Sequence, residues 1–226
     1  METPKFNRLA ERLVGQNAST LNFIHYKRLC FVRPRNQWND VFFLDLLRPT
    51  KDAFKVVVGI HVPARAKRME ILNHDNIPWP EVSSSLGILD RKQETWYEFT
   101  DADSLKDAID RMWLDFKTQA EPWLNNFNTI RDVANDYFEG HIAENLLEGM
   151  KRWPSPMSWA IYGYLLIEAG DMSAGRKWLT KARRELDKPR FMKGGQIYFE
   201  KVPGSQEIPL SDDRRGLMQI LNKENL

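Results

Sequence analysis

The spacing of apolar residues along the chain first predicts a helix and then a group of strands. Apolar residues recur at helical spacing over residues 4–14, and Gly15 suits the end of a helix. Three later segments are rich in β-branched and aromatic residues, which favour strands: residues 20–33, 39–47 and 53–62. The short polar turns between these segments favour antiparallel hairpins.

The stretch over residues 63–85 interrupts this pattern. It contains Pro63, Pro78 and Pro80 and a serine triplet at residues 83–85. Because proline and serine are typical of turns, we expect mostly loop here. Two more short strands are expected at residues 86–89 and 94–99.

From residue 103 to about residue 186 the apolar spacing becomes helical. Ser104, followed three residues later by Asp107, is typical of a capped helix start. Pro122 is expected to kink or divide the long helix that follows, because proline cannot donate a backbone hydrogen bond. Short helices are then expected at residues 129–138 and 142–150.

The clearest helical pattern is a pair of helices over residues 158–186. Gly170 suits the end of the first helix, and Asp171 or Ser173 can cap the second. Beyond Pro189 the chain is expected to be irregular, with a short strand at residues 196–202 and a last helix at residues 211–222.

Strands and helices therefore occur in separate blocks, which predicts an α+β fold rather than an alternating α/β fold. We expect an N-terminal helix and an antiparallel sheet of four to five strands with packed helices, followed by a helical extension. The predicted domains are a sheet domain over residues 1–128, the extension over residues 129–187, and an irregular C-terminal segment over residues 188–226.

Composition narrows the class of protein. Among 226 residues, 42% are hydrophobic and 28% charged, which is typical of a globular chain. Cys30, the single cysteine, lies in an apolar run and is expected to be buried, and it cannot form an internal disulfide. Residues 1–16 lack the apolar centre of a signal peptide, and no apolar run is long enough to cross a bilayer. These features predict a cytoplasmic protein.

The formal net charge of +2 conceals an acidic middle. Residues 101–150 hold 4 basic and 11 acidic side chains, whereas residues 1–100 hold 15 and 11, and residues 151–226 hold 14 and 9. An acidic middle repels phosphate, so nucleic-acid binding is not favoured. A basic protein partner is the better match.

Within that acidic middle, Asp103, Asp107 and Asp110 are spaced to share one helical face, and Asp115 follows five residues later. We predict that these carboxylates present a negative ridge to a partner. The alternative is an ordinary solvated face whose acids favour the helix dipole. The predicted aromatic anchors of such a binding surface lie in loops or at strand edges: Trp38, Trp79 and Trp96.

No catalytic, cofactor or metal motif is found in the sequence, so no cofactor is expected and a non-catalytic role is favoured. One alternative is an enzyme or nucleic-acid-processing factor that uses His74 and Asp75 together with the basic cluster of Arg65, Lys67 and Arg68. This alternative requires those side chains to meet in one cleft.

The helical pair resembles a single tetratricopeptide-type hairpin. The resemblance rests on aromatic, small and apolar residues at the positions which that pattern requires: Tyr162, Gly163, Leu166, Gly170, Asp171, Ala174, Trp178, Leu179 and Ala182. Without a second copy, such a hairpin is expected to brace the preceding helices. A regulatory adaptor that docks a partner through the hairpin is a further alternative.

The second helix of the pair is also basic on one side. Its cations are Arg176, Lys177, Lys181, Arg183 and Arg184. We interpret them as a solvated helix face, with RNA binding as the alternative.

Residues 4–134 resemble a bacterial family known only as the domain of unknown function numbered 4304. The resemblance rests on the hairpin VFFLDLLRPTKDAFKVVVGIHV, on LGIL at residues 86–89, on Trp96-Tyr97 and on EPWL at residues 121–124. It implies an antiparallel sheet with packed helices and no known active site. Proteins of this kind occur among immunity proteins of toxin systems, so the resemblance implies an immunity protein or antitoxin that occludes a basic toxin.

Overall fold

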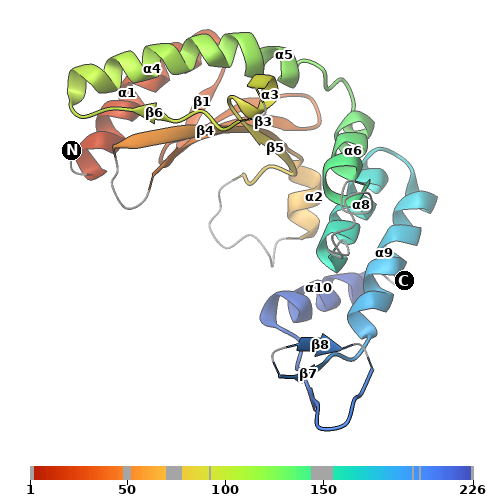
Figure 1. Cartoon of the computed structure of the whole chain (residues 1–226). Coiled ribbons are helices and arrows are strands. Elements are labelled where there is room, and N and C mark those ends of the chain that lie inside the picture. Colours follow the sequence, from red (N-terminus) through yellow and green to blue (C-terminus); the bar gives the residue numbers. More distant parts are fainter. Residues whose placement is uncertain are drawn as a thin grey trace. The chain divides into compact units, whose positions relative to one another are not determined.

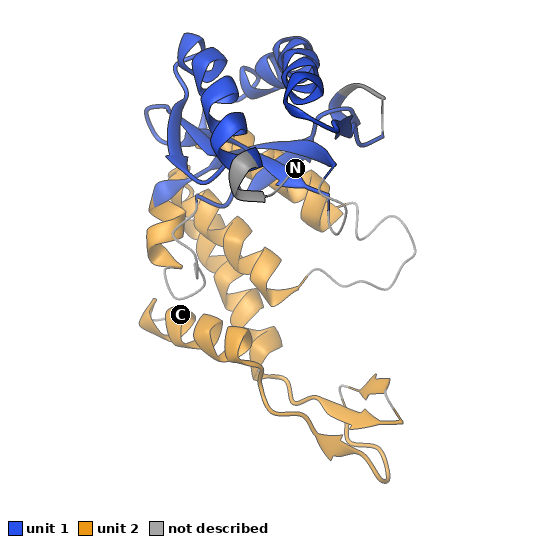
Figure 2. Ribbon diagram, turned by 90° about the vertical axis from the view of Figure 1, so that its left-hand side faces the viewer, with its two compact units in different colours: residues 1–63, 76–129 blue, residues 64–75, 130–226 orange. Residues whose placement is uncertain are grey.

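The computed structural model describes residues 3–47, 52–69, 78–91, 93–143, 155–194, 196–198 and 200–224. The chain forms two compact units (Figures 1 and 2). Unit 1 comprises residues 1–63 and 76–129, and unit 2 comprises residues 64–75 and 130–226. The predicted α+β class is confirmed.

Unit 1 is built on an antiparallel sheet in the order β1-β2-β3-β4-β5, with β6 pairing with β4 beside β5. Its strands are β1 (Ile24–Lys27), β2 (Cys30–Pro34), β3 (Asn39–Leu46), β4 (Ala53–His61), β5 (Val82–Ser85) and β6 (Tyr97–Glu98). The central pair β3–β4 is registered over eight residue pairs, from Asn39 opposite His61 to Leu46 opposite Phe54. Apolar side chains of β4 alternate at residues 54, 56, 58 and 60, and all four are fully buried.

Helices cover one face of this sheet. They are α1 (Thr3–Thr20), α3 (Ile88–Arg91), α4 (Ala102–Asp115), the π-helical turn η2 (Phe116–Ala120) and α5 (Glu121–Leu124). The helices α1 and α4 lie side by side over the strands (Figure 1). Between helices and sheet the core is aromatic: Phe42 stacks on Phe31 and meets Trp113 and Phe116 edge-on, at centroid distances of 4.8, 5.7 and 5.1 Å.

Several predicted boundaries in unit 1 are wrong. The first helix continues through Gly15 to Thr20, because helical packing on the sheet outweighs the helix-ending tendency of one glycine. The predicted strand over residues 20–33 is split into β1 and β2 by a turn in which Arg28 has φ 53°. The predicted strand at residues 86–89 is instead a turn followed by α3, whereas the serine triplet, predicted as loop, lies in β5 and pairs with β4.

The long acidic helix differs from the prediction at its start. Its capping box consists of Asp101 and Ser104, one turn before the predicted pair. The predicted division near Pro122 is confirmed: the π-helical turn η2 separates α4 from α5, and Pro122 lies in the first turn of α5, where its missing N–H group is tolerated.

Unit 2 contains most of α2 (Pro63–Arg68), then α6 (Ile130–Phe138), the π-helical turn η3 (Glu139–Ala143), α8 (Pro156–Glu168), α9 (Met172–Asp187) and α10 (Asp212–Lys223). Three short strands lie between α9 and α10, in the order β8-β7-β9: β7 (Phe191–Lys193), β8 (Gln196–Tyr198) and β9 (Gln206–Glu207). Of these strands, only β8 falls within the predicted strand at residues 196–202. The predicted helix at residues 142–150 lies largely outside the described residues.

The predicted helical pair is confirmed as the hairpin α8–α9. Gly170 has φ +86°, a left-handed conformation that ends α8 without the steric cost of a Cβ atom. The side chain of Asp171 accepts a hydrogen bond from the backbone N–H of Ala174, which caps α9. The two helices approach closely because glycines face each other at residues 163 and 175.

Candidate functional site

The acidic residues predicted as a binding ridge lie on α4, and some of them already have partners within the chain. Asp103, Asp107 and Asp110 are exposed. Lys106, on the same helix, forms an ion pair with Asp110 at 2.7 Å. The Asp115 carboxylate accepts a hydrogen bond from the Tyr97 hydroxyl at 2.8 Å. Among the described residues of the predicted ridge, Asp103 and Asp107 are therefore the carboxylates with neither an ion pair nor a side-chain hydrogen bond to another part of the chain.

The three predicted tryptophan anchors have different environments. The prediction of an exposed Trp38 is wrong: its side chain is buried and its indole N–H donates to Asp40 at 3.2 Å. Trp79 is 62% exposed and packs at a tilt on Phe43. Trp96 is half-buried, with the Lys55 ammonium 5.3 Å above its ring. Of the three, Trp79 has the exposure that an anchor requires.

The alternative site, in the loop after α2, lies mostly outside the described residues. His74 and Asp75 lie outside the described residues. Arg65 is buried, and Arg68 forms ion pairs with Glu168 at 2.8 Å and Glu224 at 3.6 Å. Within the part of the chain that the structure describes, no group of three or more His, Cys, Asp or Glu side chains is arranged to hold a metal ion.

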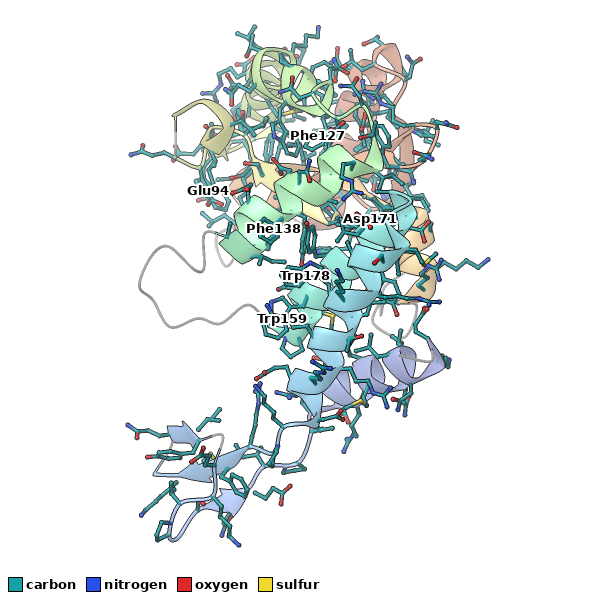
Figure 3. The ribbon with its side chains drawn as sticks, turned by 90° about the vertical axis from the view of Figure 1, so that its right-hand side faces the viewer. Glu94, Phe127, Phe138, Trp159, Asp171 and Trp178 are labelled. Atoms are coloured by element: carbon teal, nitrogen blue, oxygen red, sulfur yellow. The ribbon has the colours of Figure 1, made fainter. Side chains whose placement is uncertain are left out.

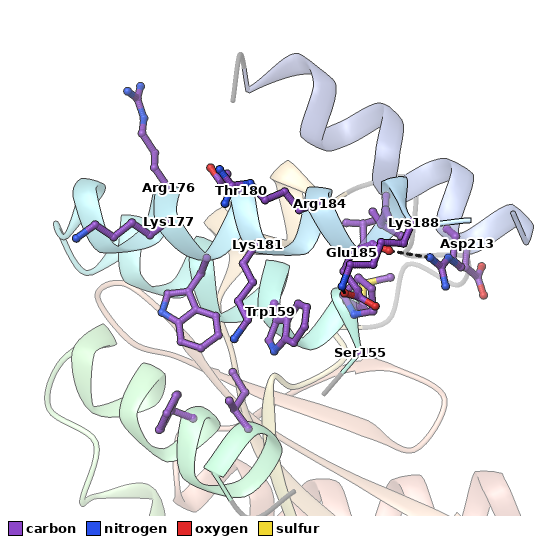
Figure 4. Close-up of a pocket in the computed structure, with 18 of the residues that line it drawn as sticks. Ser155, Trp159, Arg176, Lys177, Thr180, Lys181, Arg184, Glu185, Lys188 and Asp213 are labelled. Carbon is purple, nitrogen blue, oxygen red and sulfur yellow. Dashed lines mark hydrogen bonds and ion pairs between the residues drawn. The ribbon is translucent and has the colours of Figure 1, made fainter. Parts of the chain in front are cut away.

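Unit 2 contains an open pocket of about 1800 Å³, lined from α6, η3, α8, α9 and α10 (Figure 4). Seven of its lining residues are Lys or Arg, whereas Glu185 and Asp213 are acidic. Most of the cations come from one side of α9 and from the turn that follows it, because residues three or four apart share a helical face. The pocket is therefore strongly electropositive. We call it the basic–aromatic pocket.

The aromatic part of the pocket is organised around Lys181. Its ammonium nitrogen lies 4.4 Å from the ring centroid of Trp159 on α8 and 4.4 Å from that of Trp178 on α9. In Figure 4, Lys181 points toward Trp159, whereas Arg176 points away. An ammonium group held between two indoles is stabilised by cation–π attraction and still has N–H groups to donate.

Further aromatic side chains brace this arrangement. Trp178 meets Tyr162 edge-on at a centroid distance of 5.2 Å. It also meets Phe138 edge-on at 6.0 Å, and these two side chains lie near each other in Figure 3. The indole N–H of Trp159 is buried and has no hydrogen-bond acceptor among the described residues. The indoles are thus held by their neighbours, and a polar donor lies beside Lys181 without an acceptor.

The opposite end of the pocket contains two arginines, Arg190 after α9 and Arg214 in the first turn of α10. Arg214 donates a hydrogen bond to the backbone oxygen of Glu185 at 3.4 Å, while its Nε atom is buried without an acceptor among the described residues. Burial lowers the pKa of Arg214, and the positive charge of Arg190 lowers this pKa further. Lys188 forms an ion pair with Glu185 at 2.7 Å.

This geometry suits the binding of an anion. Cations exceed acids in the lining, and two buried donors, on Trp159 and Arg214, lack acceptors in the described structure. The solvated face predicted for the cations of α9 is confirmed for Arg176, Lys177, Lys181 and Arg184, which are exposed. The sequence did not single out Trp159, Arg190 or Arg214 as residues of the same pocket. The sequence signal for this pocket was the spacing of Trp178 and Lys181, which are three residues apart and therefore share one face of α9.

Comparison with known proteins does not assign the chain to a family: no family model, curated protein or solved structure matches it. The resemblance to the family numbered 4304 therefore remains a prediction. Among the helices of the described residues, none combines the length and apolarity needed to cross a membrane.

Proposed function

We propose that the chain is a non-catalytic protein-binding protein whose unit 2 docks an acidic segment of a partner in the basic–aromatic pocket. The observation that carries this proposal is the Lys181 ammonium, held 4.4 Å from the rings of both Trp159 and Trp178 in a lining rich in cations. The proposed role is that of an adaptor docking through the helical hairpin α8–α9.

An acidic polypeptide fits the chemistry of this pocket. A carboxylate can accept hydrogen bonds from the Lys181 ammonium, while the indoles contact the aliphatic part of the same side chain. Surplus positive charge in the lining attracts a negative segment and accelerates its association. Single-stranded nucleic acid fits less well, because it stacks bases on open aromatic faces and Lys181 already covers a face of each indole.

The test measures binding of a fluorescein-labelled peptide, eight glutamates around a central serine, to the full chain. We expect binding to weaken as salt rises from about 50 mM to about 500 mM. Lys181→Met keeps an apolar side chain between the indoles but removes the charge, and should weaken binding about tenfold, equivalent to about 1.4 kcal/mol.

The matched control is Lys223→Met, which removes the same charge from an exposed residue of α10 outside the pocket lining. It should change the affinity less than twofold. If Lys181→Met and Lys223→Met weaken binding equally, or if a glutamine peptide binds as well as the glutamate peptide, the proposed docking site is wrong.

A second candidate function, an immunity protein or antitoxin that occludes a basic toxin, is favoured by Asp103 and Asp107. Both carboxylates are exposed on α4 and have no ion pair among the described residues, and unit 1 also offers the exposed Trp79. The test is co-purification with the product of the neighbouring gene, repeated with Asp103→Lys and Asp107→Lys. A complex that survives this charge reversal unweakened would exclude the α4 face as the contact. Location in the cytoplasm is part of the same proposal.

A further inference from the structure

The positive charge of the basic–aromatic pocket is concentrated on one side of α9. The two acids of the lining, Glu185 and Asp213, lie where α9 ends and α10 begins. Three cations line that same end, which is therefore close to electrical balance: Lys188, Arg190 and Arg214. The four remaining cations of the lining all lie on α9: Arg176, Lys177, Lys181 and Arg184.

Three of these four cations form a straight row. Because an α-helix turns by about 100° per residue, Lys177, Lys181 and Arg184 lie within about 60° of one another around the axis of α9. We call these three side chains the cation row. Arg176 lies about 100° away from Lys177 on the helix, and it points away from Trp159 in Figure 4.

The cation row has no acidic partner of its own. All three side chains are exposed, and none of them forms an ion pair among the described residues. The charge of Asp171 reaches Lys177, but the ion pair of Asp171 is with Arg131, at 3.0 Å. Glu185, one turn beyond Lys181, forms its ion pair with Lys188. The row can therefore receive acids from a partner without breaking an ion pair within the chain.

We propose that the acidic segment docked in this pocket is an amphipathic α-helix with its acids along one face, at positions i, i+3 or i+4, and i+7. This inference rests on the proposed function, because it specifies the form of the same docked segment. The cation row binds the acids, and the apolar part of the lining contacts the apolar face of the partner helix.

The spacing of the cation row fits a helix better than an extended chain. The row takes a step of about 6 Å from Lys177 to Lys181 and a step of about 4.5 Å from Lys181 to Arg184. Acids at the proposed positions of a helix that runs beside α9 repeat these two steps, because both helices rise by about 1.5 Å per residue. Side chains on one side of an extended chain repeat about every 6.7 Å, so three acids would span about 13 Å where the row spans about 10.5 Å.

The apolar part of the pocket suits the other face of such a helix. Its side chains come from α6, α8, α9 and α10: Phe138, Met157, Trp159, Met172 and Leu217. Met172 is 50% exposed, so it is available for contact. A helix that places acids beside an apolar stripe binds in a groove through both of these surfaces.

The test compares three labelled 15-residue peptides of nearly equal composition on the full chain. The row peptide has glutamates at i, i+3, i+4 and i+7 beside a leucine stripe, with alanine elsewhere. The dispersed peptide has the same residues with the glutamates spread evenly around the helix. The third peptide is the row peptide with a central alanine replaced by proline, which prevents a continuous helix. We expect the row peptide to bind about tenfold more tightly than either of the others.

Variants of the chain locate the contact. In the double variant Lys177→Gln, Arg184→Gln, the ratio between the affinities for the row and dispersed peptides should fall to about one. Both substituted side chains are exposed and have no ion pair among the described residues, so the fold should be unaffected. The comparison is Arg176→Gln, which removes a neighbouring cation outside the row. It should keep the ratio near ten.

Each failure has a different meaning. If the octaglutamate peptide binds through Lys181 but the three 15-residue peptides bind equally, the helical form is wrong and acidic docking stands. If the ratio stays near ten in the double variant, the assignment to the cation row is wrong. If no peptide binds, both the inference and the proposed function are wrong. Tighter binding of a single-stranded RNA of about ten nucleotides than of the row peptide would also overturn both.

Discussion

Gly175 on α9 lies so close to Gly163 on α8 that a Cβ atom on Gly175 would be 2.6 Å from the carbonyl oxygen of Gly163 and 2.5 Å from the side chain of Ile167. The two backbones pack against each other with no room for a methyl group. Trp159 lies about one turn before Gly163 on α8, and Lys181 lies about two turns after Gly175 on α9. The close approach of the two helices at the glycines therefore brings the Lys181 ammonium within reach of the Trp159 ring. Two glycines therefore set the spacing of the pocket walls.

We expect Gly175→Ala to lower the free energy of unfolding by about 1–3 kcal/mol, because one of the two contact atoms, the carbonyl oxygen of Gly163, is backbone and cannot turn aside. The control is Gly140→Ala in η3, where an added Cβ atom would meet nothing within 4 Å. There the change should be neutral or stabilising by up to about 1 kcal/mol. Urea unfolding followed by tryptophan fluorescence measures both. Equal effects in the two variants would contradict the close contact.

The second prediction concerns Asp40, which is fully buried and holds two arginines. Its carboxylate lies 2.7 Å from Arg33 Nη2 and 2.7 Å from Arg35 Nε. Asp40→Asn removes the negative charge while the arginine charges stay, so unfolding should require roughly 3 kcal/mol less. Glu121 lies 2.6 Å from Arg33 Nη1 and still pairs with Arg33 in the variant, so the loss of stability is not larger.

The comparison for Asp40 is Asp110→Asn, which removes one member of an exposed ion pair with Lys106. Exposed pairs of this kind contribute about 0.3–0.5 kcal/mol. Both variants are measured by chemical denaturation at the same pH. A loss for Asp40→Asn as small as that for Asp110→Asn would show that the buried network does not stabilise unit 1.

The third prediction is a pH dependence at Asp171. The hydrogen bond from the Ala174 backbone N–H lowers the pKa of Asp171, and Arg131 lowers this pKa further. A carboxyl group whose pKa is lower in the folded state stabilises the fold above its unfolded pKa of about 4, and this contribution is lost as the pH falls through the folded value. Asp171→Ala should therefore be destabilising at about pH 7, and the difference from the unaltered chain should shrink below about pH 4.

Asp171→Asn serves as the control for this effect, because it keeps an acceptor for the Ala174 N–H but cannot ionise. Thermal unfolding at several pH values is the measurement. If the stability difference between Asp171→Ala and the unaltered chain is the same at about pH 3 as at about pH 7, the capping carboxylate does not contribute as a charge.

The fourth prediction concerns Cys30 in β2. The thiol is buried, and burial raises the pKa of Cys30 to about 11. Because the thiolate is the reactive form, iodoacetamide should not modify the native chain at about pH 8, whereas the unfolded chain should react within minutes. Mass spectrometry with and without urea gives the answer. Rapid modification of the native chain would contradict the buried position of β2.

Local patterns in the sequence were sufficient for the elements and the fold class. Their content of β-branched and aromatic residues predicted β3 and β4, and the glycine and aspartate at residues 170 and 171 predicted the turn of the α8–α9 hairpin. These signals work because strand propensity, helix capping and left-handed turns depend on a residue and its near neighbours in the chain. The same locality explains the errors: β5 forms from a serine triplet only because β4 lies beside it.

The candidate site depended on tertiary structure. Trp159 and Lys181 lie on different helices and meet because glycines allow α8 and α9 to approach. Arg190 and Arg214 line the same pocket because the chain returns through three short strands to α10. The tertiary structure also buried Trp38 and paired Asp110 with Lys106. The sequence alone determined which side chains were cationic or aromatic; packing between distant segments, a non-local property, decided which of them share a pocket.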